Sequence, residues 1–173
     1  MTDFEMRDAA FPANLAGWGG AVAGYVGGPN AYHVWTPADW APFITSRQPK
    51  LPIWVGGFNG EAEGWACLSA LRHLGVPLGK AVALDLETRR DITYVTAFAA
   101  VLQWGGSGYR VWPYGSASTV FGNPQLNGYW VADYAGVGPF MYDHTGVRAT
   151  QYASGPQYDS SLVKDWELAN LWK

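Results

Sequence analysis

The stretch Ala81–Glu87, AVALDLE, is an apolar run that ends in two acids placed one residue apart. A run this short and apolar predicts a buried strand, and alternate side chains of a strand point to the same side. Asp85 and Glu87 therefore face the same way, with Cα atoms about 7 Å apart, at the C-terminal end of the predicted strand. Because burial of charge is unfavourable, this pair needs a structural or chemical reason.

Seven other β-rich segments lie along the chain, so AVALDLE is the fourth of eight predicted strands. The others span residues 4–8, 21–28, 51–57, 109–115, 128–134, 148–153 and 158–163. Helical patterns at residues 36–47, 60–77 and 91–106 separate strands in the first half. Alternation of strand and helix predicts a parallel sheet with right-handed crossovers.

After residue 115 the linkers are short or rich in Gly and Pro, which predicts helices that are reduced or missing in the second half. We therefore expect an α/β fold, a compact TIM-like (β/α) barrel with eight parallel strands, in one domain over residues 1–173. The final segment DWELANLW, residues 165–172, predicts a short amphipathic helix that closes the barrel.

Composition narrows the classes of partner. The net charge is −3 and the 11 Lys and Arg are scattered, which argues against nucleic acid. The chain has one cysteine, Cys67, and no run of about 18 apolar residues, so we expect no disulfide, no cysteine-based metal site and no membrane partner. We predict a monomer without a cofactor. Aromatic residues make up 16% of the chain and suit a flat, neutral, hydroxyl-rich ligand such as a sugar.

Other acids are predicted at the barrel end where Asp85 lies. Asp8 ends the first predicted strand, Asp133 lies in the sixth, and Asp159 opens the last. In a closed parallel barrel, strand ends meet at one mouth, which is where barrel enzymes build their active sites. Cleavage of a glycosidic bond needs a proton donor and a second group that stabilises the developing cation, roles that two carboxyl groups can divide.

Three alternative roles for these acids stay open. In the first, Asp85 or Glu87 caps the next helix, and in the second it pairs with Arg89 or Arg90. In the third, the acids hold Mg²⁺ or Ca²⁺, since hard cations prefer oxygen ligands, and the protein is a metal-dependent phosphodiesterase. The lack of a Lys or His beside the acid pair counts against phosphoryl chemistry. The three histidines share no short spacing, so we predict no histidine metal site.

In order and spacing these motifs resemble the GH25 lysozymes, which are N-acetylmuramidases, and the related DUF1906 glycoside-hydrolase-like barrels. The matching elements run along nearly the whole chain: Asp8, the D-x-E of Asp85 and Glu87, the W-x-A-x-Y of Trp130, Ala132 and Tyr134, the pair Gln151 and Tyr152, and Asp159. The segment at residues 21–43 looks more like the DUF1906 branch, and Asp133 replaces an uncharged polar residue of the lysozyme pattern.

The resemblance implies a modified barrel and a peptidoglycan substrate, cut between N-acetylmuramic acid and N-acetylglucosamine. Glu87 would be the general acid. Asp85 would position the substrate's N-acetyl group for attack or stabilise the charged transition state. The remaining residues would tune these two acids or bind the glycan: Asp8, Asp159, Asp133, Tyr134, Gln151, Trp130 and Tyr25.

The same resemblance leaves a second function open, a catalytically silent barrel that binds cell-wall carbohydrate. The N-terminal residues have acids where a signal peptide would have a basic segment, so we expect synthesis in the cytoplasm. Such a protein reaches a cell wall in one of three ways: it is released by phage lysis, it is incorporated in a virion, or it is a domain of a larger chain.

Overall fold

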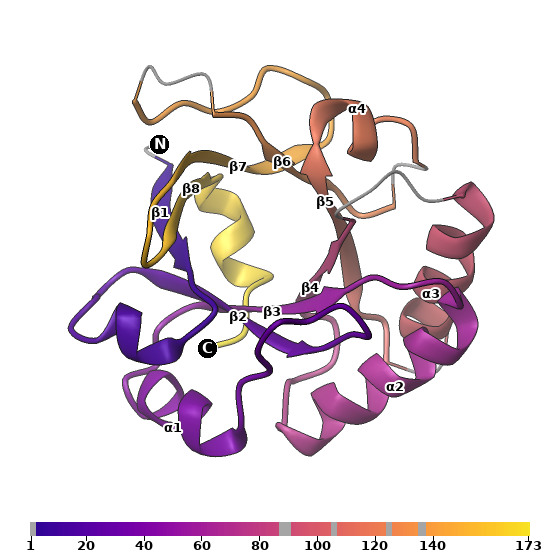
Figure 1. Cartoon of the computed structure of the whole chain (residues 1–173), viewed down its shortest axis with the longest axis horizontal. Helices are drawn as coiled ribbons and strands as arrows, with labels where there is room; N and C mark the ends of the chain where they lie inside the picture. Colours follow the sequence, from indigo (N-terminus) through magenta and orange to yellow (C-terminus); the bar gives the residue numbers. More distant parts are fainter. Residues whose placement is uncertain (1–2, 87–90, 105–106, 124–125, 135–137) are drawn as a thin grey trace.

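Eight strands, each hydrogen-bonded to the next along the chain, close into one barrel (Figure 1). The computed structural model describes residues 3–86, 91–104, 107–123, 126–134 and 138–173. The prediction of an eight-stranded TIM-like barrel is confirmed. The strands are β1 (Phe4–Asp8), β2 (Ala21–Gly27), β3 (Lys50–Val55), β4 (Ala81–Asp85), β5 (Arg110–Ser116), β6 (Tyr129–Ala132), β7 (Val147–Ser154) and β8 (Asp159–Val163).

Three helices of ordinary length cover the first half of the barrel, as the sequence predicts: α1 (Pro37–Thr45), α2 (Gly60–His73) and α3 (Ile92–Trp104). Helix α1 begins with a capping box, in which Thr36 Oγ1 accepts from the Asp39 N–H at 3.3 Å and Asp39 Oδ2 accepts from the Thr36 N–H at 2.8 Å. After β5, the α-helix in the described part of the chain is α4 (Ala117–Val120), a single turn. Reduction of the helices in the second half is therefore confirmed.

Strand β8 runs antiparallel to both of its neighbours, β7 and β1, whereas the other neighbouring strands are parallel. The expectation of an all-parallel barrel is wrong at this strand. The physical reason is the connection: only a tight turn joins β7 to β8, and a parallel arrangement needs a crossover of a dozen or more residues.

The barrel interior is filled by alternating small and large side chains. Alanines from β2, β4 and β7 face the indoles of Trp112 on β5 and Trp130 on β6, and all of these side chains are buried. Because the alanine side chains are small, the barrel interior has room for the two large indole rings. The alternation that directs these residues inward also directs the last inward residue of each strand into the mouth.

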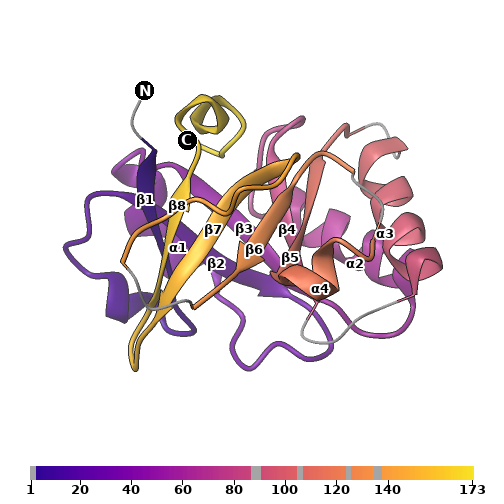
Figure 2. The ribbon, with the colours of Figure 1, turned by 90° about the horizontal axis from the view of Figure 1, so that it is seen from above.

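On the outside, α2 and α3 lie side by side against one flank of the barrel (Figure 2). They touch so closely that a Cβ atom on Gly60 would lie 2.1 Å from the carbonyl oxygen of Tyr94, and one on Gly64 would lie 2.9 Å from Val101 Cβ. Both glycines are therefore required for this helix contact. Glu63, on the same helix, accepts hydrogen bonds from the backbone N–H groups of Gly57, Phe58 and Asn59, which fixes the loop after β3.

A 3₁₀ helix, η2 (Asp165–Ala169), covers the N-terminal end of the barrel (Figure 1). The segment that follows it bonds to two strands: Trp172 exchanges backbone hydrogen bonds with Lys50 at 2.7 and 2.9 Å, and the Ala81 N–H donates to the Asn170 carbonyl at 2.8 Å. Leu171 and Trp172 are buried. The predicted closure of the barrel by this segment is confirmed, with a 3₁₀ helix as its form.

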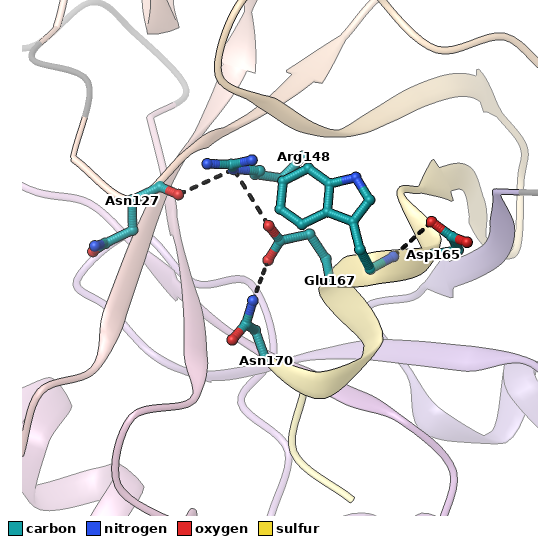
Figure 3. Close-up of polar contacts among 6 residues, drawn as sticks. Asn127, Arg148, Asp165, Glu167 and Asn170 are labelled. Atoms are coloured by element: carbon teal, nitrogen blue, oxygen red, sulfur yellow. Dashed lines mark hydrogen bonds and ion pairs between the residues drawn. The ribbon is translucent and has the colours of Figure 1, made fainter. Parts of the chain in front are cut away.

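Glu167 anchors this closure (Figure 3). Its carboxylate is fully buried, lies 3.4 Å from Arg148 Nε, and accepts from Asn170 Nδ2 at 2.7 Å. The Arg148 guanidinium also donates to the Asn127 carbonyl at 3.2 Å and lies 4.4 Å from the centre of the Trp166 ring. A charge buried at this depth is favourable only because these partners surround it.

Replacing Glu167 by Ala should therefore destabilise the protein by about 2–4 kcal/mol, because Arg148 would be left without its buried partner. Urea denaturation measures this loss as a lower midpoint. The matched control is Glu5→Ala, which removes the partly exposed Arg7–Glu5 pair (3.4 Å) and should change stability by less than about 1 kcal/mol. Equal losses in the two variants would contradict this account of the closure.

Candidate functional site

Three aspartates meet at the mouth of the barrel formed by the C-terminal ends of the parallel strands. Asp8 and Asp85 are the last residues of β1 and β4, and Asp159 is the first residue of β8. Asp8 and Asp159 are direct partners in the antiparallel ladder. The reversed direction of β8 is what brings Asp159 here, because the first residue of a parallel strand would lie at the opposite end of the barrel.

Asp8 is the most deeply buried of the three, with 4% of its surface exposed. Burial raises the pKa of its carboxyl group well above the ordinary value, and the nearby charges of Asp159 and Asp85 raise it further. Its Oδ1 atom is buried without a hydrogen-bond partner among the described residues. Asp8 therefore keeps a proton at pH values where an exposed aspartate has lost it.

Asp85 lies between two hollows of the mouth, and its side chain lines both. The larger hollow has a volume of about 440 Å³, and its polar walls include Tyr114, Ser116 and Tyr134. The smaller one, of about 100 Å³, is lined on its far side by Tyr25, Asn30, Tyr32 and His33. Asp85 is therefore the residue that the two hollows share.

Tyr114 is a residue of the mouth that the sequence analysis missed. It is the strand-register neighbour of Asp85 on β5, and its hydroxyl donates to Gln151 Oε1. Burial raises the pKa of its phenol well above the ordinary value, and the charges of Asp8 and Asp85 add to this effect. The alternation of VWPYG, which directs Trp112 inward and hence Tyr114 also, is the signal that would have found it.

Trp130 and Gln151 do not contact a sugar ring in this structure, because both side chains are fully buried. Trp130 packs against Tyr114 with ring centres 4.4 Å apart and donates from Nε1 to Ser161 Oγ at 3.1 Å. The structure therefore does not support direct sugar contacts by these two residues, and their predicted role stays a prediction. They lie beneath Tyr114 and support it.

Tyr134 and Asp133, which are adjacent in sequence, have different positions. Tyr134 lines the larger hollow with 55% of its surface exposed, and its pKa is raised by burial and by the charges of Asp159, Asp8 and Asp85. Asp133 continues the alternation of β6 on the side of Val131, which packs in an outer cluster. It is not among the charges that raise the pKa of Asp8. The prediction that Asp133 joins the group of acids is therefore not supported.

The predicted general acid, Glu87, lies outside the described residues, as do Arg89 and Arg90. The alternative ion pairs of the acid motif with these arginines therefore stay a prediction. Within the described ranges, no group of three or more His, Cys, Asp or Glu side chains has an arrangement that would hold a metal ion. No helix in those ranges is long and apolar enough to span a membrane.

Comparisons with known proteins identify the fold. No family model and no curated protein sequence matches the chain. A protein of B. stearothermophilus superimposes with a TM-score of 0.74 at 18% identity, over 97% of this chain and 99% of that one. The catalytic domain of endolysin ply40, from bacteriophage P40 of Listeria monocytogenes, gives 0.70 at 16% identity, over 97% and 96%.

The modular autolysin LytC of Streptococcus pneumoniae, solved with a synthetic peptidoglycan ligand, gives a TM-score of 0.71 at 12% identity. This match covers 92% of the present chain and 46% of the autolysin. At such identities the similarity establishes a shared fold. The barrel is of the kind found in endolysin and autolysin structures.

The buried acid at the mouth predicts how stability depends on pH. The folded-state pKa of Asp8 is raised, so its contribution to stability is fully present below the unfolded-state pKa and is lost as pH rises through the folded-state pKa. Asp8→Asn, which is uncharged at every pH, should therefore be more stable than the parent at pH 7, which thermal unfolding shows as a higher Tm. The gain should vanish near pH 3. Thermal melts across this range measure it, with exposed Asp143→Asn as control; a gain independent of pH would contradict the raised pKa.

Proposed function

We propose that this protein is a lysozyme-like glycoside hydrolase that cleaves bacterial cell-wall glycan. The observation that carries the proposal is that Asp8, Asp85 and Asp159 come to one end of the barrel, where Asp85 lines two hollows and where burial and the charges of Asp159 and Asp85 raise the pKa of Asp8. Carboxyl groups that share a site but differ in protonation are the arrangement that glycosidic hydrolysis uses.

The similar folds support this proposal. The ply40 structure is of an endolysin catalytic domain, the LytC structure holds a peptidoglycan ligand, and SleM of Clostridium perfringens is a spore cortex lytic enzyme with a TM-score of 0.69 at 10% identity. The order of acidic motifs that resembles the GH25 lysozymes supports the finer assignment. We propose the β-1,4 bond between N-acetylmuramic acid and N-acetylglucosamine as the bond that is cut.

In the proposed mechanism, Glu87 donates its proton to the glycosidic oxygen as the bond from that oxygen to the anomeric carbon breaks. The carbonyl oxygen of the sugar's own N-acetyl group attacks the anomeric carbon and forms a cyclic oxazolinium ion. Water then adds to the anomeric carbon, reopens the ring and gives a proton to the Glu87 carboxylate. The anomeric configuration is retained, and no external reagent other than water is consumed.

Asp85 assists this reaction in one of two ways. It orients the N-acetyl group for its attack, or its negative charge stabilises the positively charged transition state. Both roles suit a carboxyl group that lines both hollows of the mouth. Asp8 and Asp159 set the local charge, while Tyr134 and Tyr25 provide the walls against which sugar rings lie.

The test uses purified cell walls from several bacteria and mass spectrometry of the released muropeptides. The parent protein should create new reducing ends at N-acetylmuramic acid, and Glu87→Gln should lower the rate at least about 100-fold, since general acid catalysis contributes that much or more. The control is Glu5→Gln, an acid of β1 that pairs with Arg7 and, by alternation with the interior residue Met6, faces the outside of the barrel.

Three outcomes would overturn all or part of the proposal. No new ends with the parent protein, together with saccharide binding that persists in Glu87→Gln, would identify a catalytically silent carbohydrate-binding barrel instead. New ends at N-acetylglucosamine would keep a glycosidase but reject the proposed bond. Full activity of Glu87→Gln would remove Glu87 as the acid.

A further inference from the structure

We propose that the outer face of helices α2 and α3 carries a second glycan-binding site, in which the indole rings of Trp65 and Trp104 hold a stretch of cell-wall glycan outside the mouth. The choice of ligand rests on the proposed function. The two indoles line one hollow of about 400 Å³. The described residues that line it all differ from those that line the two hollows beside Asp85, so this site is separate from the mouth.

The exposure of these two indoles is the first observation. Trp104 has 83% of its surface exposed and Trp65 has 52%, although most Trp side chains in folded proteins are largely buried. Exposed apolar side chains that gather in one place mark a binding surface, whereas scattered ones need no explanation. The barrel buries other indoles almost completely, among them Trp35, Trp40, Trp112 and Trp130. Packing therefore does not account for the two exposed rings.

The helices that carry the two rings are held in fixed positions against each other (Figure 2). Gly64, the residue before Trp65, lies so close to α3 that a Cβ atom on it would be 3.0 Å from the Phe98 carbonyl oxygen. The position of Trp65 on α2 is thereby tied to the helix that carries Trp104. A ligand that contacts both rings does not have to order the two helices, and this lowers the entropic cost of binding.

The hollow between the rings has a floor of short side chains. Its residues on α3 recur at the three- and four-residue spacing of one helix face, and its two residues on α2 lie one turn apart. They are Ala97, Ala100, Val101 and Trp104 on α3, and Glu61 and Trp65 on α2. The alanine side chains are single methyl groups, whereas the indoles reach much farther from their helices. A flat ring can therefore enter the hollow and lie against an indole.

The chemistry of the hollow fits a neutral sugar. One face of a sugar ring presents C–H groups that pack on an indole, while the hydroxyl and N-acetyl groups at its edge need hydrogen-bond partners. Each indole N–H is a donor, and the Glu61 carboxylate accepts from hydroxyl groups. Glu61 is the charged residue among the described lining residues, so the hollow offers no attraction to an anion. A chain of N-acetylated sugars meets these conditions.

The size of the apolar surface favours a glycan over a second copy of this chain. A whole Trp side chain buries up to about 250 Å², so the exposed parts of the two indoles amount to roughly 300 Å². A stable interface between proteins buries about 800 Å² on each partner. The apolar surface at the hollow falls well short of that area, but it is enough for one or two sugar rings.

The experiment titrates ¹⁵N-labelled protein with chitotetraose, a β-1,4-linked tetramer of N-acetylglucosamine, and follows the indole N–H signals by NMR. The Glu87→Gln protein is used, so that the probe stays intact. The Trp65 and Trp104 signals should shift together and saturate. Trp104→Ala should weaken the binding that the Trp65 signal reports by roughly tenfold, and Trp65→Ala should do the same to the Trp104 signal. Trp104→Phe keeps a ring and should weaken binding less than Trp104→Ala.

The matched control is Leu78→Ala, which removes an exposed apolar side chain outside the hollow, with 62% of its surface exposed. It should leave the affinity reported by both indoles unchanged. Indole signals that do not move at millimolar chitotetraose would overturn the proposal. So would signals that move with protein concentration in the absence of the probe and stop doing so in Trp104→Ala, because the occupant would then be a second copy of this chain.

Analysis of released muropeptides decides the proposed function separately. If the parent protein cleaves no wall glycan while both indoles bind chitotetraose, the proposed hydrolase is wrong and the outer site stands. If wall glycan is cleaved and the indole signals do not move, the hydrolase stands and the outer site is wrong.

Discussion

The closure of the barrel by one reversed strand is the constraint on which the mouth depends. Strand β8 fits between β7 and β1 while running against both, and so its first residue comes level with the last residue of β1. Three aspartates from distant parts of the sequence thereby come to the same end of the barrel. A sheet left open between β1 and β8 would separate Asp8 from Asp159 and would remove one of the two charges that, in addition to burial, raise the pKa of Asp8.

The interior changes character along the barrel axis. Apolar side chains, alanines against indoles, fill the lower part, and the same inward-facing rows end in Asp8, Asp85, Tyr114 and Gln151. Because the apolar part excludes water, charge at the mouth is solvated poorly from below, and each carboxyl group feels its neighbours strongly. The alternation of inward and outward side chains along the strands therefore determines both the packing of the interior and the environment of the acids at the mouth.

Most of the barrel could be predicted from the sequence because strand and helix periodicity, caps and glycine stops are local signals. The direction of β8 was missed, because a short strand reads alike in both directions; the signal that would have found it is the β7–β8 connection, which is too short for a parallel crossover. At the site, Asp8, Asp85 and Asp159 were correctly placed together. The prediction that Asp133 joins the acids is not supported, and the alternation from Trp130 already indicates that Asp133 faces outward. The burial of Trp130 and Gln151 could not be predicted from their own strands, because Tyr114, which lies over them, comes from another strand.

The joining of the chain's two ends has a consequence for biogenesis. Residues near the start pair with β8, and Lys50 pairs with Trp172 near the end of the sequence. During synthesis, the outer edges of β1 and β7 lack a partner strand until β8 has emerged from the ribosome. Long-range closure of this kind slows folding and exposes sheet edges to other chains. Recombinant production should therefore profit from slow translation, low temperature or chaperones that shield the nascent half-barrel.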